Sequence, residues 1–402
     1  MLEQEMEMSY IEGTTEDKRK GRRVNRRELL SVESCFVAFS FFIVLSQFLL
    51  YAVSDTISKP FRPLIVLILA IMVVRRGRLK LAVCTTSLAM SVYQCMVWFF
   101  YYPKGGALTE YLTIILYFMM LFSVSSFPWN RRELRLIVHS AFLATFVCAV
   151  VFFISNNMLD FSEHEYLFWG MHVNRNKNAY AFALGLVLGW HHLSFGKGNK
   201  KLLIVFMILL EGYCLIYSQS RGAFICVFLA FCVIVLNKLV GMYRNGNPFL
   251  PICFLIFLMS CILGYLLIKG SPVSRLVDGE NLSGRDEGIK HAVELFIKAP
   301  VLGKIFGNGL LYEINNTVGV GVHLVYLTYI LEGGIIATGM IIVLFLQSMR
   351  RMRGEIQWSL FMLAFFKTFV EGMDYYVFIP LILAICISNY ENMFRRPGSE
   401  LF

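Results

Sequence analysis

Residues 222–240, GAFICVFLAFCVIVLNKLV, form a nearly uninterrupted apolar stretch. About 20 such residues are enough to cross the hydrocarbon core of a bilayer as a helix. Similar blocks recur along the chain, which is 57% hydrophobic and only 16% charged. A soluble protein carries about a quarter charged residues, and a membrane β-barrel needs alternating apolar and polar residues. The continuous blocks therefore predict an all-α, polytopic membrane protein.

The apolar blocks predict about twelve membrane spans. We place them at 35–53, 61–74, 79–100, 108–127, 134–155, 178–195, 201–218, 222–240, 249–269, 323–347, 357–373 and 375–390. Residues 1–34 are then a basic tail that we expect to be disordered. Residues 35–269 carry spans one to nine, 270–322 form a long loop, 323–390 carry the last three spans, and 391–402 form a second tail.

Lys and Arg are unevenly distributed between the two sides of these spans. If the N-terminus is cytoplasmic, they fall about two to one on the inner segments, which supports two cytoplasmic termini. The net charge of +10 is then mainly a topology signal, with the basic tail attracted to anionic lipid rather than to nucleic acid. All ten Cys lie inside the expected spans, so neither a disulfide framework nor a Cys-based metal site is indicated.

The loop at 270–322 is long for a membrane protein and lies outside the cytoplasm in this topology. Within it, Ser283 and Asp286 can cap a helix that Pro300 stops. The residues on the apolar face of that helix are Ile289, Ala292, Val293 and Phe296. We therefore expect an amphipathic helix that lies on the membrane surface or covers a cavity.

Two arginines stand at expected helix starts on the outer side. Ser220 can cap the helix that begins near Arg221, and Arg285 opens the loop helix. The free N–H groups of a helix start, its dipole and an arginine fork all suit a phosphate oxygen. Together the two arginines could bind a pyrophosphate and stabilise the charge that develops as it leaves. The alternative is that they extend to lipid headgroups.

His323 begins the tenth span from the outer side. A histidine can take a proton from an attacking sugar hydroxyl, whereas the alternative role is a simple polar helix cap. Asp278 and Glu280 in the loop could ligate a divalent cation. Two acids on a Gly-rich loop are usually solvated, so we expect no metal.

The second outer loop, at 156–177, ends in Asn174-Arg175-Asn176. Its amide and aromatic side chains suit sugar binding, and an interfacial aromatic belt explains them equally well. Inside the spans, the acids Glu211 and Glu332 are functional candidates. Residues 367 and 371, a lysine and a glutamate on one helix face, most simply neutralise each other.

The order of these motifs resembles the O-antigen ligase and O-antigen polymerase-like superfamily of bacterial membrane proteins. Its members have many spans and a large outer loop just before a His-bearing helix. The resemblance covers about residues 170–345. The motifs that carry it are Asn174-Arg175-Asn176, Ser220-Arg221-Gly222, Ser283-Gly284-Arg285, Pro300-Val301-Leu302-Gly303, His323 and Glu332-Gly333-Gly334-Ile335-Ile336.

This resemblance implies a polysaccharide polymerase of the bacterial cytoplasmic membrane with an extracytoplasmic active site. It would transfer glycan from an undecaprenyl-pyrophosphate-linked oligosaccharide donor to a sugar hydroxyl of a glycan acceptor, a second lipid-linked repeat unit. The transfer would invert the anomeric centre and need neither metal nor cofactor. Arg221 and Arg285 would bind the pyrophosphate, and His323 would act as base or orient the acceptor. The chain departs from the family pattern at Leu324, where a small polar residue is common, and at Ala337, where a glycine is usual.

Two other functions use the same features. Ligation of finished glycan to another acceptor needs the same residues, and no residue identifies the acceptor. A flippase for lipid-linked oligosaccharide would have repeated halves and charges spread through its spans, whereas this chain has no visible repeat and its notable cations lie outside. We therefore expect an enzyme that works among membrane lipid, beside a flippase and a chain-length regulator.

Overall fold

The computed structural model is predominantly helical, as the sequence predicts, with one short two-stranded sheet. It describes residues 35, 38, 39, 42, 81–101, 115, 118–125, 129, 131–156, 165–168, 171–195, 199–218, 220–244, 285–309, 325–352, 354–370 and 378–394. The elements are α5 (Leu81–Tyr101), α7 (Arg131–Asn156), β1 (Glu165–Phe168), β2 (Met171–Asn174), α8 (Arg175–Phe195), α9 (Asn199–Tyr217), α10 (Arg221–Arg244), α12 (Arg285–Lys298), α13 (Val301–Phe306), α15 (Val325–Glu332), α16 (Gly334–Met349), α17 (Glu355–Val370) and α18 (Phe378–Phe394).

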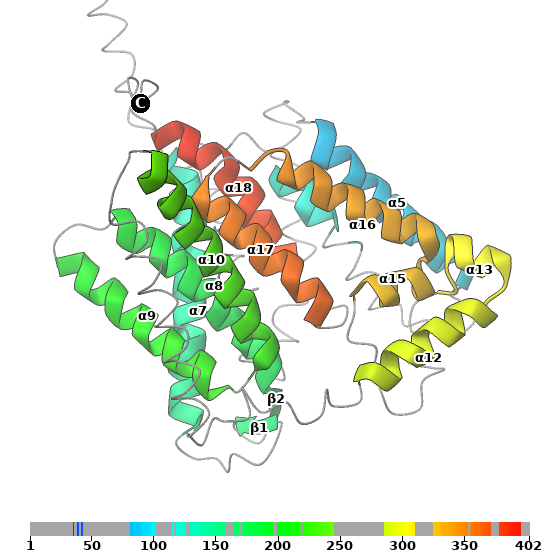
Figure 1. The fold of residues 1–402 in the computed structure, drawn as a ribbon, viewed down its shortest axis with the longest axis horizontal. Coiled ribbons are helices and arrows are strands. Elements are labelled where there is room, and N and C mark those ends of the chain that lie inside the picture. The colour runs from blue at the N-terminus through cyan, green and yellow to red at the C-terminus, as the bar shows by residue number, and fades with distance from the viewer. Residues whose placement is uncertain are drawn as a thin grey trace, which may run out of the picture.

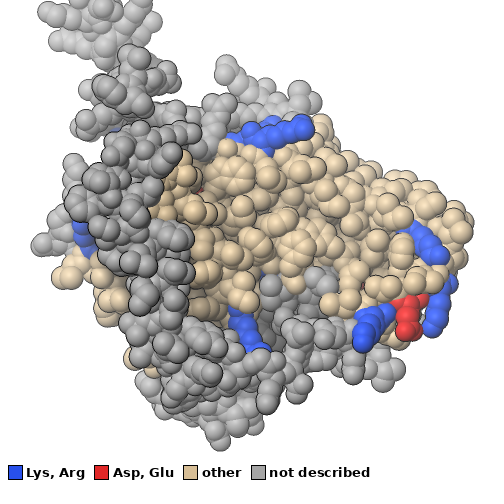
Figure 2. All heavy atoms as spheres, in the orientation of Figure 1, with Lys and Arg blue, Asp and Glu red and all other residues tan. Residues whose placement is uncertain are grey.

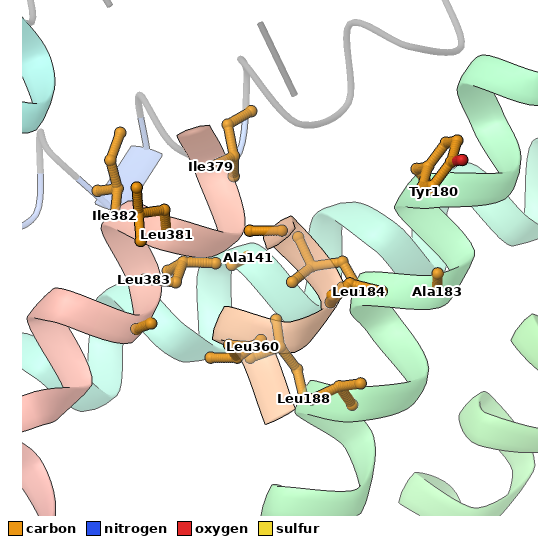
Figure 3. Packing of buried hydrophobic residues seen from close by; sticks show 14 of the residues in the cluster. Ala141, Tyr180, Ala183, Leu184, Leu188, Leu360, Ile379, Leu381, Ile382 and Leu383 are labelled. Atoms are coloured by element: carbon orange, nitrogen blue, oxygen red, sulfur yellow. The ribbon is translucent and has the colours of Figure 1, made fainter. Parts of the chain in front are cut away.

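A bundle of α7, α8, α9, α10, α17 and α18 forms the main core (Figure 1). α10 packs along α17, α8 contacts α7, α9 and α10, and α18 lies against α17 and α7. Small residues on the contact faces let the helices approach closely. The buried alanines on these faces include Ala141, Ala183, Ala223, Ala230, Ala364 and Ala384. Figure 3 shows the centre of this core, where Leu184 and Leu188 of α8 lie near Leu360 of α17 and Leu383 of α18.

A second group of helices lies beside the bundle, at the right of Figure 1. There α16 packs against α5, α13 and α15, and α12 packs against α15. Both α15 and α16 also contact α17, which joins this group to the bundle. The group therefore connects α12 and α13 to the main bundle.

α12 forms where the amphipathic pattern predicts a helix in the long loop. Ala292 is buried against Leu331 of α15, with Phe296 packed at the edge of the same cluster. Val293, expected on this face, is exposed instead. The apolar contact is therefore narrower than predicted, because the main described partner of α12 is the short helix α15.

The expected span 323–347 contains two helices rather than one. α15 ends at Glu332 and α16 begins at Gly334, with Gly333 between them. Gly334 has a φ of 72°, a conformation that costs glycine little and other residues much more. A short loop segment packs into this break, as described below.

β1 and β2 form an antiparallel hairpin inside the expected outer loop at 156–177. Glu165 pairs with Asn174, and Phe168 pairs with Met171. This hairpin is a local addition to an otherwise helical fold, because helix and membrane-span patterns do not detect strand pairing in a polar, aromatic loop. Asn174 is the last residue of β2, and Arg175 is the first residue of α8.

Two helical segments in the described part of the chain are apolar and long enough to cross a bilayer, at Arg132–Ile154 and Arg221–Val240. Shorter apolar helices occur at Ala179–Leu193 and Gly334–Met349. The expected spans at 61–74 and 249–269 lie outside the described residues. The total of twelve spans therefore stays a prediction.

The exposed side of α9 is apolar. Leu202 is 76% exposed and Leu209 is 66% exposed, whereas Glu211, on the opposite side of the helix, is fully buried. A helix on a water-facing surface has the reverse arrangement. In the face shown in Figure 2, a broad area without charged side chains separates Lys and Arg side chains near its borders. Both features are typical of a bundle surrounded by lipid.

Candidate functional site

Contacts at one end of the bundle establish how its helices are oriented. Lys238, near the end of α10, lies over Trp190 of α8 with its Nζ 4.7 Å from the ring centroid. Burial raises the pKa of the Glu355 carboxyl at the start of α17, and the charge of Lys238 lowers it. α8 and α10 therefore end on the side where α17 begins. The starts of α8 and α10 lie on the opposite side, together with the end of α17 (Figure 1).

The start of α15 reaches the same end of α17. Tyr326, the second residue of α15, lies with its ring 5.1 Å from that of Phe369 near the end of α17. His323 itself lies outside the described residues, and α15 begins two residues after it, at Val325. The helix that follows His323 is thus anchored on the side of the bundle that carries the starts of α8 and α10.

Ser220 occupies the position that caps α10. Its carbonyl oxygen accepts a hydrogen bond from the Phe224 N–H at 3.0 Å, and Ser220 is buried. The Ser220 N–H donates to the hydroxyl oxygen of Ser218 at 3.4 Å, and the Ser218 hydroxyl donates to the Leu215 carbonyl at 2.6 Å. Sequence reasoning did not single out Ser218, although a second serine at a helix turn is a recognisable signal.

Arg221 is the first residue of α10 and is partly exposed. It therefore stands at the positive end of the helix dipole, as the sequence predicts. Arg285 is likewise the first residue of α12. The N-terminal end of α12, the end away from α13, is on the lower side of Figure 1, as are the starts of α8 and α10.

Asn174, Arg175 and Asn176 lie at the junction of β2 and α8. Their chain position places them at the start of α8, on the side that also carries Arg221. The backbone thus brings the candidates at 174–176 and at 220–221 to the same end of the bundle, although the segments are distant in sequence.

The segment after α13 is bound into the break between α15 and α16. The N–H groups of Asn308 and Gly309 donate to the carbonyl oxygens of Leu331 and Glu332, each at 3.0 Å. The Asn308 side-chain amide donates to the Leu331 carbonyl as well, also at 3.0 Å. Two carbonyl groups that the end of α15 would leave unsatisfied are thereby paired with N–H groups of the segment after α13. We call this contact the latch.

Two glycines allow the latch to close. A Cβ at Gly307 would overlap the Glu332 carbonyl, and a Cβ at Gly334 would overlap the Ile305 carbonyl. Both glycines also have positive φ, 88° and 72°. The close approach of the two backbones therefore depends on the absence of side chains at these positions.

Tyr93 of α5 completes the latch. Its hydroxyl lies 2.9 Å from the Phe306 carbonyl oxygen and 2.8 Å from that of Gly333. The hydroxyl can donate to either carbonyl and thereby bridges α13 and the α15–α16 break. The helix that begins with Arg285 is thus held in register with the helix that follows His323.

Glu211 is the most deeply buried acid among the described residues that the sequence singled out. The Thr145 hydroxyl of α7 donates to its Oε1 at 2.8 Å, and Oε2 has no hydrogen-bond partner in the described part of the chain. The carboxyl fills the space above Gly185 of α8. It therefore joins three helices in the interior of the bundle, rather than facing the end that carries the arginines.

At the opposite end of the bundle, His139 and His192 form an edge-to-face pair with ring centroids 4.3 Å apart. Within the described ranges, no group of three or more His, Cys, Asp or Glu could hold a metal ion. Asp278 and Glu280, the alternative metal ligands, lie outside the described residues, as does Glu371.

Comparison with known proteins leaves the family open. No family model matches the chain, and no curated protein matches it. The resemblance to O-antigen ligases and polymerases therefore stays a prediction that rests on the residues and on their arrangement.

Proposed function

We propose that this chain is a bacterial membrane polysaccharide polymerase. It transfers glycan from an undecaprenyl-pyrophosphate-linked donor to a sugar hydroxyl of a second lipid-linked repeat unit. The observation that carries the proposal is the meeting of three helix starts at one end of the bundle. These are the start of α10 at Arg221, the start of α8 at Arg175, and the start of α15 just after His323.

The proposed reaction is a single inverting displacement. The acceptor hydroxyl oxygen forms a bond to the anomeric carbon of the donor as the bond from that carbon to the pyrophosphate oxygen breaks. His323 takes the hydroxyl proton. Arg221 and Arg285 stabilise the negative charge that passes to the leaving undecaprenyl pyrophosphate. Ser220, Asn174, Arg175 and Asn176 bind the sugar and phosphate groups around this centre.

The lipid donor requires a site at the membrane surface. The apolar outer face of α9 and the apolar segment Arg221–Val240 support a bundle that is surrounded by lipid. The excess of Lys and Arg on the other ends of the helices then assigns the arginine-bearing end to the outer side. We accordingly place the chain in the bacterial cytoplasmic membrane, with cytoplasmic termini.

The first test is polymer formation by arginine and histidine variants. Arg221→Ala, Arg285→Ala and His323→Ala should each lower polymer yield about a hundred-fold or more, because each removes a group used in the transition state. Arg350→Ala is the matched control, since Arg350 is exposed at the end of α16. Wild-type yield from a correctly folded Arg221 or Arg285 variant would exclude the pyrophosphate-binding role.

The proposed reaction needs no metal. EDTA should leave polymer formation unchanged, and replacement of Asp278 and Glu280 together by Asn and Gln should have little effect. Strong inhibition by EDTA, or a large loss of polymer in the double variant, would instead favour a divalent cation held by these acids.

The burial of Glu211 is the observation that favours a second candidate, a proton-coupled transporter of lipid-linked oligosaccharide. Glu211→Gln separates the two functions, because it keeps the size of the side chain and the oxygen that accepts from Thr145. A polymerase should retain most of its activity in this variant, whereas a proton-coupled transporter should lose transport. Ligation to another acceptor would use the same residues as the polymerase and would appear only when that acceptor is supplied.

A further inference from the structure

α12 and α13 carry an exposed apolar surface beside the latch. Six apolar residues on these two short helices are between 37% and 71% exposed. They are Val293, Ile297, Val301, Leu302, Ile305 and Phe306, and we call this surface the α12–α13 face. It shares only Val293 with the apolar face that the sequence predicts for the loop helix. Ala292 and Phe296 of that predicted face pack with Leu331 of α15 instead.

Two hydrogen bonds between α5 and α16 establish the direction of α5. The Thr86 hydroxyl donates to the side-chain oxygen of Gln347 at 2.8 Å, near the end of α16 that leads into α17. About two turns further along α5, the Tyr93 hydroxyl lies 2.8 Å from the Gly333 carbonyl oxygen, at the start of α16. α5 therefore runs toward the arginine-bearing end of the bundle, and it continues beyond Tyr93 to Tyr101.

α13 lies beside a part of α5 that belongs to an expected membrane span, 79–100. The Phe306 carbonyl oxygen is 2.9 Å from the Tyr93 hydroxyl. Phe99 and Phe100 lie further along α5, and both rings are largely exposed. Exposed apolar side chains that gather in this way mark a contact with a membrane or another protein. The α12–α13 face thus lies at the depth of the exposed, apolar end of α5.

The direction and the charges of α12 suit a membrane surface. In Figure 1, α12 lies across α5 and α16 rather than along them, as a helix in the plane of the interface does. Its exposed residues Lys290, Glu294 and Lys298 lie next to the exposed Val293 and Ile297. Figure 2 shows charged side chains over α12 at the border of the area without charges. Lysines beside an apolar stripe can extend to lipid phosphates while the stripe enters the acyl chains.

We propose that the α12–α13 face inserts into the outer leaflet of the membrane, with Lys290 and Lys298 at the level of the lipid phosphates. The inference goes beyond the proposed function, because contact with lipid does not depend on any reaction. The common depth with the end of α5 favours lipid over a second protein chain. Insertion holds the helix that begins with Arg285 at a fixed depth, because the latch joins the segment after α13 to α15 and α16.

The test uses the wild-type protein in liposomes of phosphatidylglycerol and phosphatidylethanolamine. A small share of the phospholipid carries a diazirine on its acyl chain, so that illumination attaches lipid to side chains within the leaflet. Mass spectrometry then locates the attachment. We expect labelling on α13 and at Leu209 of α9, an exposed apolar residue that serves as the positive control. Labelling of α9 without any labelling of α12 or α13 would overturn the inference.

A charge placed on the α12–α13 face gives a second measurement. Leu302→Glu should lower the labelling of the rest of α13, because a carboxylate among acyl chains is costly. Labelling of Leu209 should not change. Leu302→Met keeps the position apolar and is the matched control, and the exposed position lets both variants fold. Equal labelling of α13 in the two variants would overturn the inference.

Charge reversal tests the two lysines. Lys290→Glu/Lys298→Glu should lower the labelling of α13 in these liposomes, because the new carboxylates repel anionic lipid. Lys200→Glu/Lys201→Glu is the matched control, since both lysines are exposed at the start of α9, at a distance from α13. Unchanged labelling of α13 in the first double variant would overturn the assignment of the lysines to the lipid phosphates.

Other occupants of the α12–α13 face give different results. A second copy of the chain would prevent labelling of α13, and amine cross-linking through Lys298 would then yield a dimer. A segment of the same chain would prevent labelling and leave a monomer. Either result would overturn the inference. None of these measurements depends on polymer formation, so failure of the polymerase would leave the inference intact.

Discussion

At the scale of single residues, the Glu211 carboxyl fills the space that Gly185 leaves on the neighbouring helix. Thr145 supplies the hydrogen bond that a polar group needs in an apolar interior. The sequence identifies Glu211 as an intramembrane acid, but it does not identify its partner, because Thr145 is 66 residues away. The contact explains how the acid is accommodated in the apolar interior of the bundle.

Replacement of Gly185 tests this contact. Gly185→Ala should destabilise the protein by about 1–3 kcal/mol, because its Cβ would overlap the Glu211 carboxyl. Gly212→Ala is the matched control, since its Cβ would meet only Leu186 at 3.8 Å, an ordinary contact. Thermal unfolding in detergent measures both. Equal stability of the two variants would show that Glu211 does not occupy this space.

Other features of single residues also differ in whether the sequence alone predicts them. The start of α10 at Ser220 and Arg221 follows from local polarity at the edge of an apolar block, so the sequence predicts it. The position of Lys367 over Tyr180 depends on the packing of α8 against α17, and no local pattern encodes that packing. The pair of Lys367 with Glu371 stays a prediction, because Glu371 lies outside the described residues. It is predicted because neighbours on one helix can be recognised without the fold.

At the scale of elements, the latch connects α12 and α13 to α15 and α16. It pairs the backbone after α13 with the break between α15 and α16, and Tyr93 of α5 bridges both. The sequence predicts the loop helix α12 from its amphipathic pattern and its caps. It does not predict the break at Gly333, because two glycines in an apolar run are also compatible with a continuous membrane helix.

The glycines of the latch should be intolerant of substitution. Gly307→Ala and Gly334→Ala each combine an unfavourable positive φ with overlap of a carbonyl group. Each should abolish polymer formation or folded protein, since the backbone strain alone is of order 1–3 kcal/mol. Gly339→Ala, in α16, has open space at its Cβ and should behave as the wild type. Normal yield and activity of the Gly334 variant would contradict the latch.

Removal of the Tyr93 hydroxyl should have a smaller effect than substitution of the latch glycines. Tyr93→Phe removes the bridging hydroxyl and keeps the ring, so we expect a loss of about 0.5–1.5 kcal/mol in unfolding free energy. Polymer formation should fall as α12 loses its register against α15. Tyr213→Phe, with an exposed ring on α9, is the control and should change neither quantity. A Tyr93 variant that matches this control would show that the bridge is not needed.

At the scale of the whole molecule, polar side chains such as Glu211 and Gln357 are buried among the described helices, whereas the outer face of α9 is apolar. The length and periodicity of the apolar blocks predict this helical architecture. The β1–β2 hairpin was not predicted, because a short pairing in a polar, aromatic loop leaves no helical or membrane-span signal. Several helix starts meet at one end because successive helices alternate in direction. The sequence predicts this arrangement only through the uneven distribution of Lys and Arg between the two sides of the expected spans.

The sidedness of the molecule is testable with single cysteines in a variant that lacks the native ones. A cysteine at Lys298, exposed on α12, should react with a membrane-impermeant maleimide added to intact cells. A cysteine at Lys200, exposed at the start of α9, should react only after the membrane is permeabilised. The reverse pattern would place the proposed site on the cytoplasmic side, where the reaction is not expected.

The most direct test of the central claim uses the purified wild-type protein in liposomes that contain an undecaprenyl-pyrophosphate-linked repeat unit. The glycans are then separated on a gel by length. We expect a ladder of progressively longer lipid-linked glycans, formed without added metal or nucleotide. Movement of the unchanged repeat unit between leaflets without any ladder would contradict the polymerase and identify a transporter instead.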